Sequence, residues 1–142
     1  MNKKIVIVLA IAWLAIAATS AGAADNGTVT INGLVWLKNT NCFNYLKWIA
    51  AKSAAESLKD GQCNLSDGSQ AGQWRLPTML ELKSVFSSRG QFTNVAYPYW
   101  SSTLYSTDAF TGYSWYYVVL DEHTVTYNNS VGISHVWPVR NP

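Results

Sequence analysis

The stretch Trp74–Leu82 reads WRLPTMLEL and places a helix start beside a tryptophan and an arginine. Thr78 stands three residues before Glu81, the spacing of a capping box in which each side chain bonds the other residue's backbone N–H. Pro77 comes just before this pair and cannot continue a helix from upstream. The stretch therefore predicts the N-terminus of a helix. Its expected apolar face consists of Met79, Leu80, Leu82, Val85 and Phe86.

Arg75 lies between Trp74 and Leu76, in an apolar setting. A buried guanidinium needs an acceptor, because an unpaired buried charge is very costly. We expect Arg75 to tie the helix to a sheet through a carboxylate or backbone carbonyls. The alternative is that Arg75 contacts an acidic ligand. Arg140, near the end of the last predicted strand, allows the same two interpretations.

Two further elements are predicted before this stretch. The segments Thr28–Ile31 and Leu34–Leu37 favour strands, and the Asn32-Gly33 pair between them is typical of a tight hairpin turn. Residues 44–58 lack glycine and proline and predict a helix. Its expected apolar side consists of Leu46, Ile49, Ala50, Ser53, Ala54 and Leu58.

After Gly90 the chain becomes rich in β-formers and aromatic residues. Four strands are predicted there, over residues 99–105, 113–121, 124–128 and 133–140. With the hairpin and the two helices, this order predicts an α+β domain with both helices on one side of an antiparallel sheet.

The N-terminal residues 1–24 have a basic start, a short apolar run and small residues where a signal peptidase cuts. This pattern predicts a cleaved signal peptide, with a retained N-terminal anchor as the alternative. One domain, residues 25–142, then remains, in a secreted, periplasmic or cell-surface location. Without Lys3 and Lys4 its basic and acidic residues balance, and no basic run indicates a nucleic-acid partner.

Cys42 and Cys63 flank the first predicted helix. In an oxidising compartment two such cysteines tend to pair, and closing this loop contributes about 3 kcal/mol on the chain-entropy estimate. Two free thiols and a metal pair are the alternatives. The polar loop after the helix contains Asp60, Asn64, Ser66 and Asp67, but its spacing does not match the helix–loop–helix calcium pattern. We therefore expect no metal and no cofactor.

Four motifs occur in a characteristic order: GLVWLK from Gly33, WRLPTMLEL from Trp74, YWSST from Tyr99 and VWPVR from Val136. Together they resemble the Lcl C-terminal domain, found at the C-terminal end of a collagen-like bacterial adhesin. The resemblance covers residues 30–140 and implies a C-type lectin-like fold, in which two helices pack on a twisted antiparallel sheet. It implies structural roles for Trp74, Arg75, Leu76, Pro77, Thr78, Glu81, Trp100, Ser101, Ser102 and Arg140.

The RLPT segment also resembles one in the formylglycine-generating enzymes, which share that general fold. Their chemistry needs a reactive cysteine pair in the C-terminal half, and this chain has none there. His123 falls in a predicted turn and His135 in a predicted strand, so neither is marked as a catalytic base. We expect no enzymatic activity.

The aromatic residues favour binding instead. Tyrosine and tryptophan offer large contact areas at low entropic cost, and their faces suit sugar rings. By strand alternation, Trp115 and Tyr117 face one side, while Tyr116 and Val118 face the other. Core packing is the alternative for any one of them. The candidate ligand-binding residues are Tyr105, Tyr113, Trp115, Tyr116, Tyr117 and Tyr127.

The sequence therefore predicts an exported, non-catalytic binding domain that recognises a glycan or a cell-surface protein. The animal-lectin calcium triplets are absent, and the basic residues through which the adhesin relatives are expected to reach sulfated polysaccharides are few and scattered. The alternative is a structural or assembly subunit that binds a protein partner in the cell envelope. A homo-oligomer is possible, although the Gly-X-Y repeats that trimerise the collagen-like relatives are missing.

Overall fold

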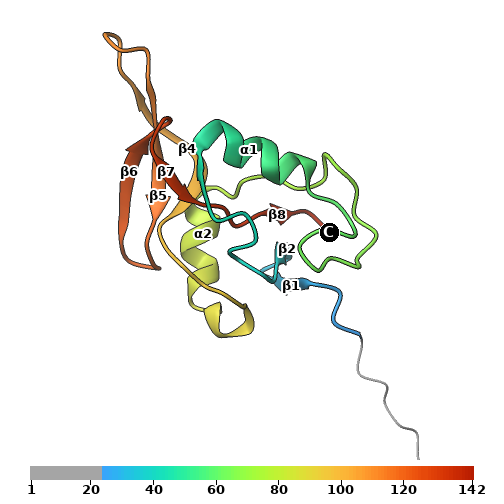
Figure 1. The fold of residues 1–142 in the computed structure, drawn as a ribbon. Helices are drawn as coiled ribbons and strands as arrows, with labels where there is room; N and C mark the ends of the chain where they lie inside the picture. The colour runs from blue at the N-terminus through green and yellow to red at the C-terminus, as the bar shows by residue number, and fades with distance from the viewer. Residues whose placement is uncertain (1–23) are drawn as a thin grey trace, which may run out of the picture.

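The computed structural model describes residues 24–142, so the predicted signal peptide at residues 1–24 lies almost entirely outside the described residues. The described chain forms two α-helices, one 3-10 turn and a series of short strands (Figure 1). Their bounds are β1 (Thr28–Ile31), β2 (Leu34–Leu37), β3 (Tyr45–Lys47), α1 (Trp48–Ser57), α2 (Met79–Phe86), η1 (Arg89–Gln91), β4 (Tyr99–Thr107), β5 (Ser114–Val119), β6 (Val125–Asn129), β7 (Ile133–His135) and β8 (Val139–Arg140).

The strands form two sheets, and the expected α+β class is confirmed. The smaller sheet has the order β1-β2-β8, so a strand near the start of the domain pairs with the last strand. The larger sheet has the order β3-β7-β4-β5-β6, and its β4–β7 pair is parallel while its other pairs are antiparallel. Residues 133–140, predicted as one strand, contribute β7 to the larger sheet and β8 to the smaller one.

The first hairpin forms as predicted. Ile31 pairs with Leu34, and the turn residues Asn32 and Gly33 both have positive φ, at 51° and 76°. This backbone conformation is costly for most residues but accessible to asparagine and glycine. The turn therefore fixes the register between β1 and β2, and β2 pairs with β8 along its other edge.

The first helix differs from its prediction in both start and face. It begins at Trp48, because residues 45–47 pair with β7 as strand β3. Its buried residues are Ala51 and Ala55, whereas Ile49, expected on the apolar side, is 63% exposed. Two small alanines let the helix backbone approach the sheet closely, and this contact outweighs the burial of Ile49.

The two helices cover opposite faces of the larger sheet, so the prediction that both lie on one side is wrong. On one face α2 packs Leu82, Val85 and Phe86 into a core with Tyr99 and Val119. Trp100 and Val118, the strand neighbours of Tyr99 and Val119, point to the opposite face. There they pack with Val136 and with the buried alanines of α1. The exposed fraction of Leu80, expected on the apolar face of α2, is 69%.

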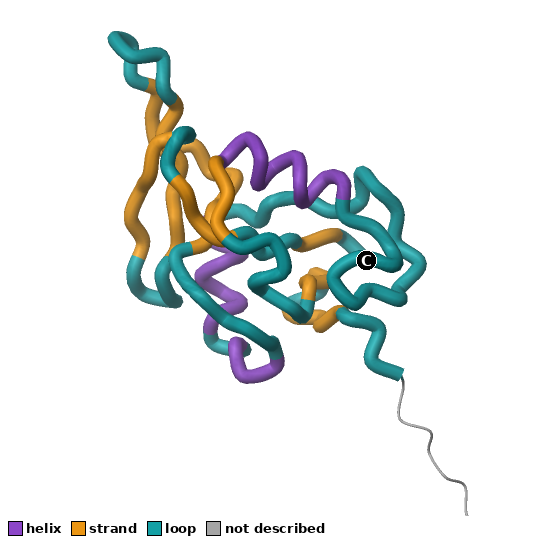
Figure 2. The backbone as a smooth tube through the Cα atoms, in the orientation of Figure 1, coloured by secondary structure: helices purple, strands orange, loops and turns teal. Residues whose placement is uncertain are grey.

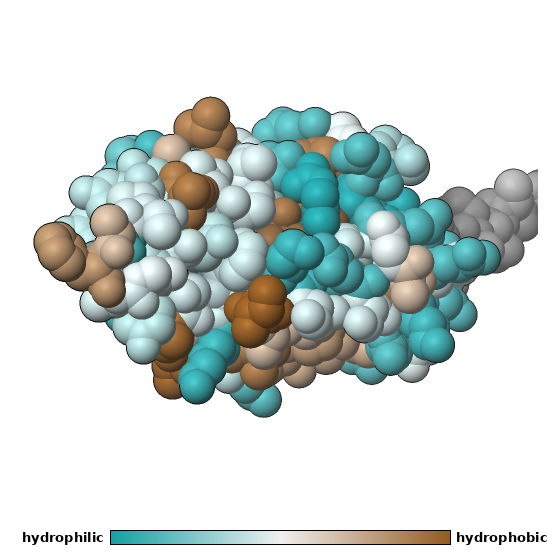
Figure 3. All heavy atoms as spheres, turned by 90° about the horizontal axis from the view of Figure 1, so that it is seen from above, coloured by the Kyte–Doolittle hydropathy of each residue, from teal (hydrophilic) through white to brown (hydrophobic). Residues whose placement is uncertain are grey.

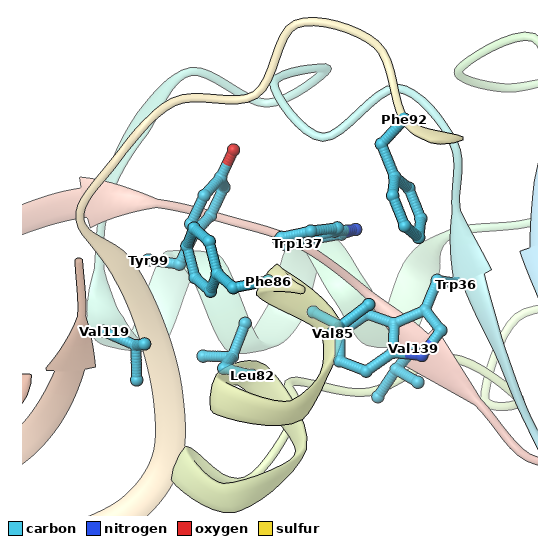
Figure 4. Close-up of a cluster of buried hydrophobic side chains, with 9 residues drawn as sticks. All are labelled: Trp36, Leu82, Val85, Phe86, Phe92, Tyr99, Val119, Trp137 and Val139. Carbon is cyan, nitrogen blue, oxygen red and sulfur yellow. The ribbon is translucent and has the colours of Figure 1, made fainter. Parts of the chain in front are cut away.

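Trp137 is the centre of the core on the α2 side (Figure 4). Its ring meets Phe86, Phe92 and Tyr99 at centroid distances of 5.7, 4.8 and 5.0 Å. Trp36 of the smaller sheet lies 5.4 Å away, edge to face. The ring of Trp137 therefore joins the two sheets and α2 into one packed unit.

A disulfide joins Cys42 to Cys63, as predicted. The loop that this bond closes contains α1. At the other side of the molecule the β4–β5 hairpin extends beyond the packed body (Figure 2). This hairpin leaves a length of sheet that neither helix covers.

Candidate functional site

Four aromatic side chains gather on the part of the larger sheet that α2 leaves open. Tyr117 precedes Val119 by two residues in β5, so both side chains point to the same side of the sheet, the side that α2 covers. Tyr117 lies beyond the part of that side which the helix covers. Tyr127 pairs with Tyr117 across β5 and β6, and Trp115 follows on the same side. We call the surface formed by Tyr105, Trp115, Tyr117 and Tyr127 the aromatic face.

A β-bulge brings Tyr105 to this face. Leu104 pairs with Tyr116 and Ser106 pairs with Trp115, so Tyr105 has no opposite residue in β5. An unpaired bulge residue bends the strand and redirects its side chain. Tyr105 accordingly reaches over β5, and its ring stacks on that of Tyr127, with centroids 4.3 Å apart and planes 2° apart.

Edge contacts hold the rest of the aromatic face in place. The rings of Tyr105 and Tyr117 meet at 5.3 Å with an interplanar angle of 83°, and those of Trp115 and Tyr127 meet at 5.7 Å with 77°. Tyr105 and Tyr127 are about half exposed. The four rings are thus fixed against one another while part of their surface stays open to solvent.

The strands that carry the aromatic face contain few charges. No lysine or arginine occurs between Arg89 and Arg140, and the hairpin that carries Tyr105 and Trp115 has a single charged residue, Asp108. Seen from above, the half of the molecule with the larger sheet is mostly pale, with scattered hydrophobic patches (Figure 3). Such a surface is amphipathic and suits a neutral ligand better than an anionic one.

Two of the six predicted binding residues lie elsewhere. Tyr116 points to the α1 side, where it stacks on Trp48 at 3.8 Å and 9°. The Trp48 indole N–H in turn donates to the carbonyl of Ser101 at 3.0 Å. Tyr113 lies at the tip of the hairpin, separate from the aromatic face, and is 45% exposed.

The hairpin tip also carries Phe110, which sequence reasoning missed. Its side chain is fully exposed. Asp108 Oδ1 accepts the backbone N–H groups of Phe110 and Thr111, and these bonds lower the pKa of Asp108. Gly112, at φ 70°, completes the turn. The sequence did contain a signal for this exposure. Phe110 stands between Asp108 and Gly112, residues typical of a turn, and a turn at this position exposes the phenylalanine to solvent.

The WRLPTMLEL residues connect the start of α2 to β4 of the larger sheet and to β8 of the smaller one. The capping box of Thr78 and Glu81 is present, and Arg75 donates two hydrogen bonds to the same Glu81 carboxylate. Those bonds lower the pKa of Glu81. The backbone of Arg75 exchanges hydrogen bonds with Val139 of β8. Arg75 thus contacts a carboxylate of its own chain, and Trp74, Leu76 and Pro77 are buried beside it.

Residues of YWSST anchor β4 to its neighbours. The Trp100 indole N–H donates to the carbonyl of Leu46 at 2.7 Å, and the Ser101 hydroxyl donates to the carbonyl of Tyr117 at 2.8 Å. Ser102 donates to the carbonyl of Pro77 through its backbone N–H at 2.8 Å. These bonds connect β4 to β3, to β5 and to the start of α2.

Arg140 forms the more buried of the two arginine pairs. Its Nη2 lies 3.0 Å from Asp67 Oδ2, and the Asp67 side chain is only 1% exposed. Burial tends to raise the pKa of Asp67, but hydrogen bonds from Ser69 and Arg140 outweigh it and lower the pKa. The Arg140 guanidinium also lies over the ring of Trp74, 5.3 Å from its centroid. The Asp67 carboxylate is therefore engaged within the fold.

The two histidines have unlike settings. His123 is 83% exposed in the β5–β6 turn. His135 is buried, its Nδ1 lies 2.8 Å from Asn41 Oδ1, and burial lowers its pKa. Within residues 24–142, no cluster of three or more His, Cys, Asp or Glu side chains is arranged to hold a metal. Over the same residues, no helix has the length and apolar character needed to cross a membrane.

The sequence profile of the Lcl C-terminal domain matches residues 27–140. The match covers most of the chain, so the chain belongs to the Lcl C-terminal domain family, which occurs in bacterial collagen-like adhesins and has a C-type lectin-like fold. A search of curated proteins finds no match to the chain.

Proposed function

We propose that this chain is an exported, non-catalytic domain that binds a glycan at the cell surface through its aromatic face. The observation that carries the proposal is the arrangement of four mutually packed, partly exposed aromatic rings on one uncharged sheet surface. Sugar rings present apolar C–H faces that stack on aromatic rings, and fixed rings bind them at low entropic cost.

The charge distribution supports a neutral glycan over a sulfated one. An anionic polysaccharide needs lysine or arginine side chains near the contact surface, and β4, β5 and β6, the strands that carry the aromatic face, contain neither. Binding through stacking is expected to vary little with ionic strength, because no charge pair is screened. Family membership supports an adhesin-type role but leaves the ligand open.

The disulfide supports an extracytoplasmic location. Bonds such as Cys42–Cys63 persist in oxidising compartments and are rare in the reducing cytosol. A secreted, periplasmic or cell-surface domain is therefore proposed. A non-catalytic role is supported by membership of the Lcl C-terminal domain family, whose members are generally non-catalytic.

A second candidate function is assembly with a protein partner in the envelope. The observation that favours it is Phe110, which is fully exposed on a fixed turn at the end of a projecting hairpin. An ordered, exposed aromatic side chain of this kind suits insertion into an apolar pocket of a partner.

A glycan array with neutral and sulfated polysaccharides tests the proposal on the purified protein, at two salt concentrations and with and without chelator. The expected result is saturable binding to neutral glycans that changes little with salt or chelator. Binding confined to sulfated glycans and abolished by salt would contradict the proposed role of the aromatic face. No binding to any glycan would favour the protein-partner function, which Phe110→Ser should then impair in a pull-down from an envelope fraction.

A further inference from the structure

A separate pocket lies at the opposite end of the β4–β5 hairpin from its tip. It has a volume of about 710 Å³, within the usual range for ligand clefts. Its apolar lining residues are Phe86, Val95 and Leu120. Phe86 belongs to the buried core and Val95 packs against that core, so this part of the lining is held in place.

Tyr97 forms an aromatic wall of the pocket and is 65% exposed. The segment that carries it is held in place by Tyr99, whose hydroxyl accepts the backbone N–H of Ala96 at 2.7 Å. That hydroxyl also donates to Thr40 Oγ1 at 2.8 Å. The wall is thus tied to the protein interior while the Tyr97 ring stays available to a ligand.

Carboxylates and a guanidinium share the rim. Asp121 Oδ1 accepts the backbone N–H groups of His123 and Thr124 at 2.8 and 2.7 Å, which fixes the β5–β6 turn. These bonds lower the pKa of Asp121 and keep it ionised. Its Oδ2 has no hydrogen-bond partner among residues 24–142. Glu122 also lines the pocket, and its Oε1 lies 3.6 Å from Nδ1 of the exposed His123. Arg89, a further lining residue, uses Nη1 to bond the carbonyl of Phe86, and its Nη2 makes no hydrogen bond within the described chain.

This combination selects a ligand by elimination. The two carboxylates oppose an anion, and Arg89 opposes a simple cation. Hydroxyl groups can donate to Asp121 and Glu122 and also accept from Arg89. A pyranose ring carries such hydroxyls at its edge, and its apolar face can stack on Tyr97 and contact the apolar lining residues of the pocket.

We propose that this pocket binds a neutral hexose unit, as a site separate from the aromatic face. This proposal rests on the proposed glycan recognition and extends that function. The pocket would give the domain a polar site that distinguishes sugars by the positions of their hydroxyl groups. The aromatic face offers mainly stacking, which is tolerant of sugar identity. The pocket therefore supplies the selectivity of the domain.

Amide NMR on the purified protein, titrated with glucose, galactose, mannose and N-acetylglucosamine, tests the proposal. We expect at least one hexose to shift the backbone amides of His123 and Thr124 in a saturable manner. Glu122→Gln and Tyr97→Ala should each weaken that affinity about tenfold, the effect of losing one charged hydrogen bond or one stacking contact. The matched control Glu56→Gln, on α1, should leave it unchanged.

The outcomes separate this proposal from the one on which it rests. If hexoses shift only the amides of Trp115 and Tyr127, the pocket proposal is wrong and the aromatic face retains its role. The pocket is likewise excluded if the His123 and Thr124 shifts occur with unchanged affinity in both variants. Shifts at the pocket that survive Trp115→Ala support the pocket whatever the fate of the aromatic face.

Discussion

Arg75 and Glu81 meet through two parallel hydrogen bonds, 2.8 Å from Nη1 to Oε2 and 2.9 Å from Nη2 to Oε1. The same Glu81 Oε2 accepts the backbone N–H of Thr78 at 2.8 Å. One carboxylate therefore closes the capping box of α2 and pairs with an arginine whose backbone is bonded to β8. This contact links the start of the second helix to the smaller sheet, and it accounts for the arrangement of WRLPTMLEL.

Arg75→Ala should lower the free energy of unfolding by about 1–2 kcal/mol. A bidentate pair is stronger than an ordinary surface pair, but the Arg75 side chain is 39% exposed, and solvent screening limits its contribution. Urea unfolding measures this change. Lys52→Ala is the control, because it breaks the exposed Lys52–Glu56 pair and should lower the free energy of unfolding by less. Glycan affinity of the folded protein should stay the same. A stable variant that loses binding would assign Arg75 to a ligand site instead.

Asp67→Ala should destabilise the protein more than Arg75→Ala does. The Asp67 side chain is nearly fully buried against Arg140, so its removal leaves a largely buried guanidinium without its partner. Breaking a buried pair in this way costs about 3 kcal/mol. Asp60→Ala is the control for the loop itself, since Asp60 is exposed and its carboxylate accepts, within residues 24–142, only the backbone N–H of Gly68, at 3.0 Å. Equal losses for the two variants in urea unfolding would show that the loop, and not the ion pair, is responsible.

Local signals in the sequence predicted the elements that local interactions fix. The Asn32-Gly33 turn and the Thr78–Glu81 capping box are both formed within a few residues, and both are present. The start of α1 depended on a distant partner, because residues 45–47 become a strand only by pairing with β7. Its buried face was misjudged because alanine fits either side of a helix, and the tertiary contact decided which side was buried.

The site was predictable only in part, for a similar reason. Alternation correctly separated Tyr117 from Tyr116. Which side would be open depended on how far α2 extends along the sheet, and the sequence pattern carries no such information. The approach of Tyr105 to Tyr127 depends on a bulge in β4, which changes the register within a strand that looks regular.

Stability should fall as the pH drops below about 6.5, the pKa of histidine in an unfolded chain. Burial lowers the pKa of His135 in the folded state, so between the two pKa values the unfolded chain binds the proton more readily. The stabilisation is therefore complete above the unfolded pKa and decreases toward the folded one. Denaturant unfolding between about pH 7 and pH 5 should show this slope in the native chain and a flatter one in His135→Gln. Equal slopes would rule out His135 as its origin.

Replacing Cys42 and Cys63 together by serine should lower the free energy of unfolding by about 3 kcal/mol, because the unfolded chain regains the freedom of the closed loop. Unfolding of the native protein with and without reductant gives the same comparison without mutation. The double variant should show no further response to reductant. If reduction destabilises the double variant as well, the loss in the native protein does not come from this bond.

Tyr127 and Tyr116 provide a matched pair for the aromatic face, since they stand on adjacent strands and stack on opposite sides of one sheet. Tyr127→Ala removes a half-exposed ring from the proposed contact surface and should weaken glycan binding about tenfold with little effect on stability. Tyr116→Ala removes the ring that stacks on Trp48 and should cost about 2 kcal/mol of unfolding free energy while leaving affinity unchanged. Calorimetric titration measures the glycan affinity of each variant, and urea unfolding measures the free energy of unfolding of each. Equal losses of affinity in the two folded variants would mean that the glycan does not distinguish the two sides of the sheet, and the assignment of binding to the aromatic face would have to be abandoned.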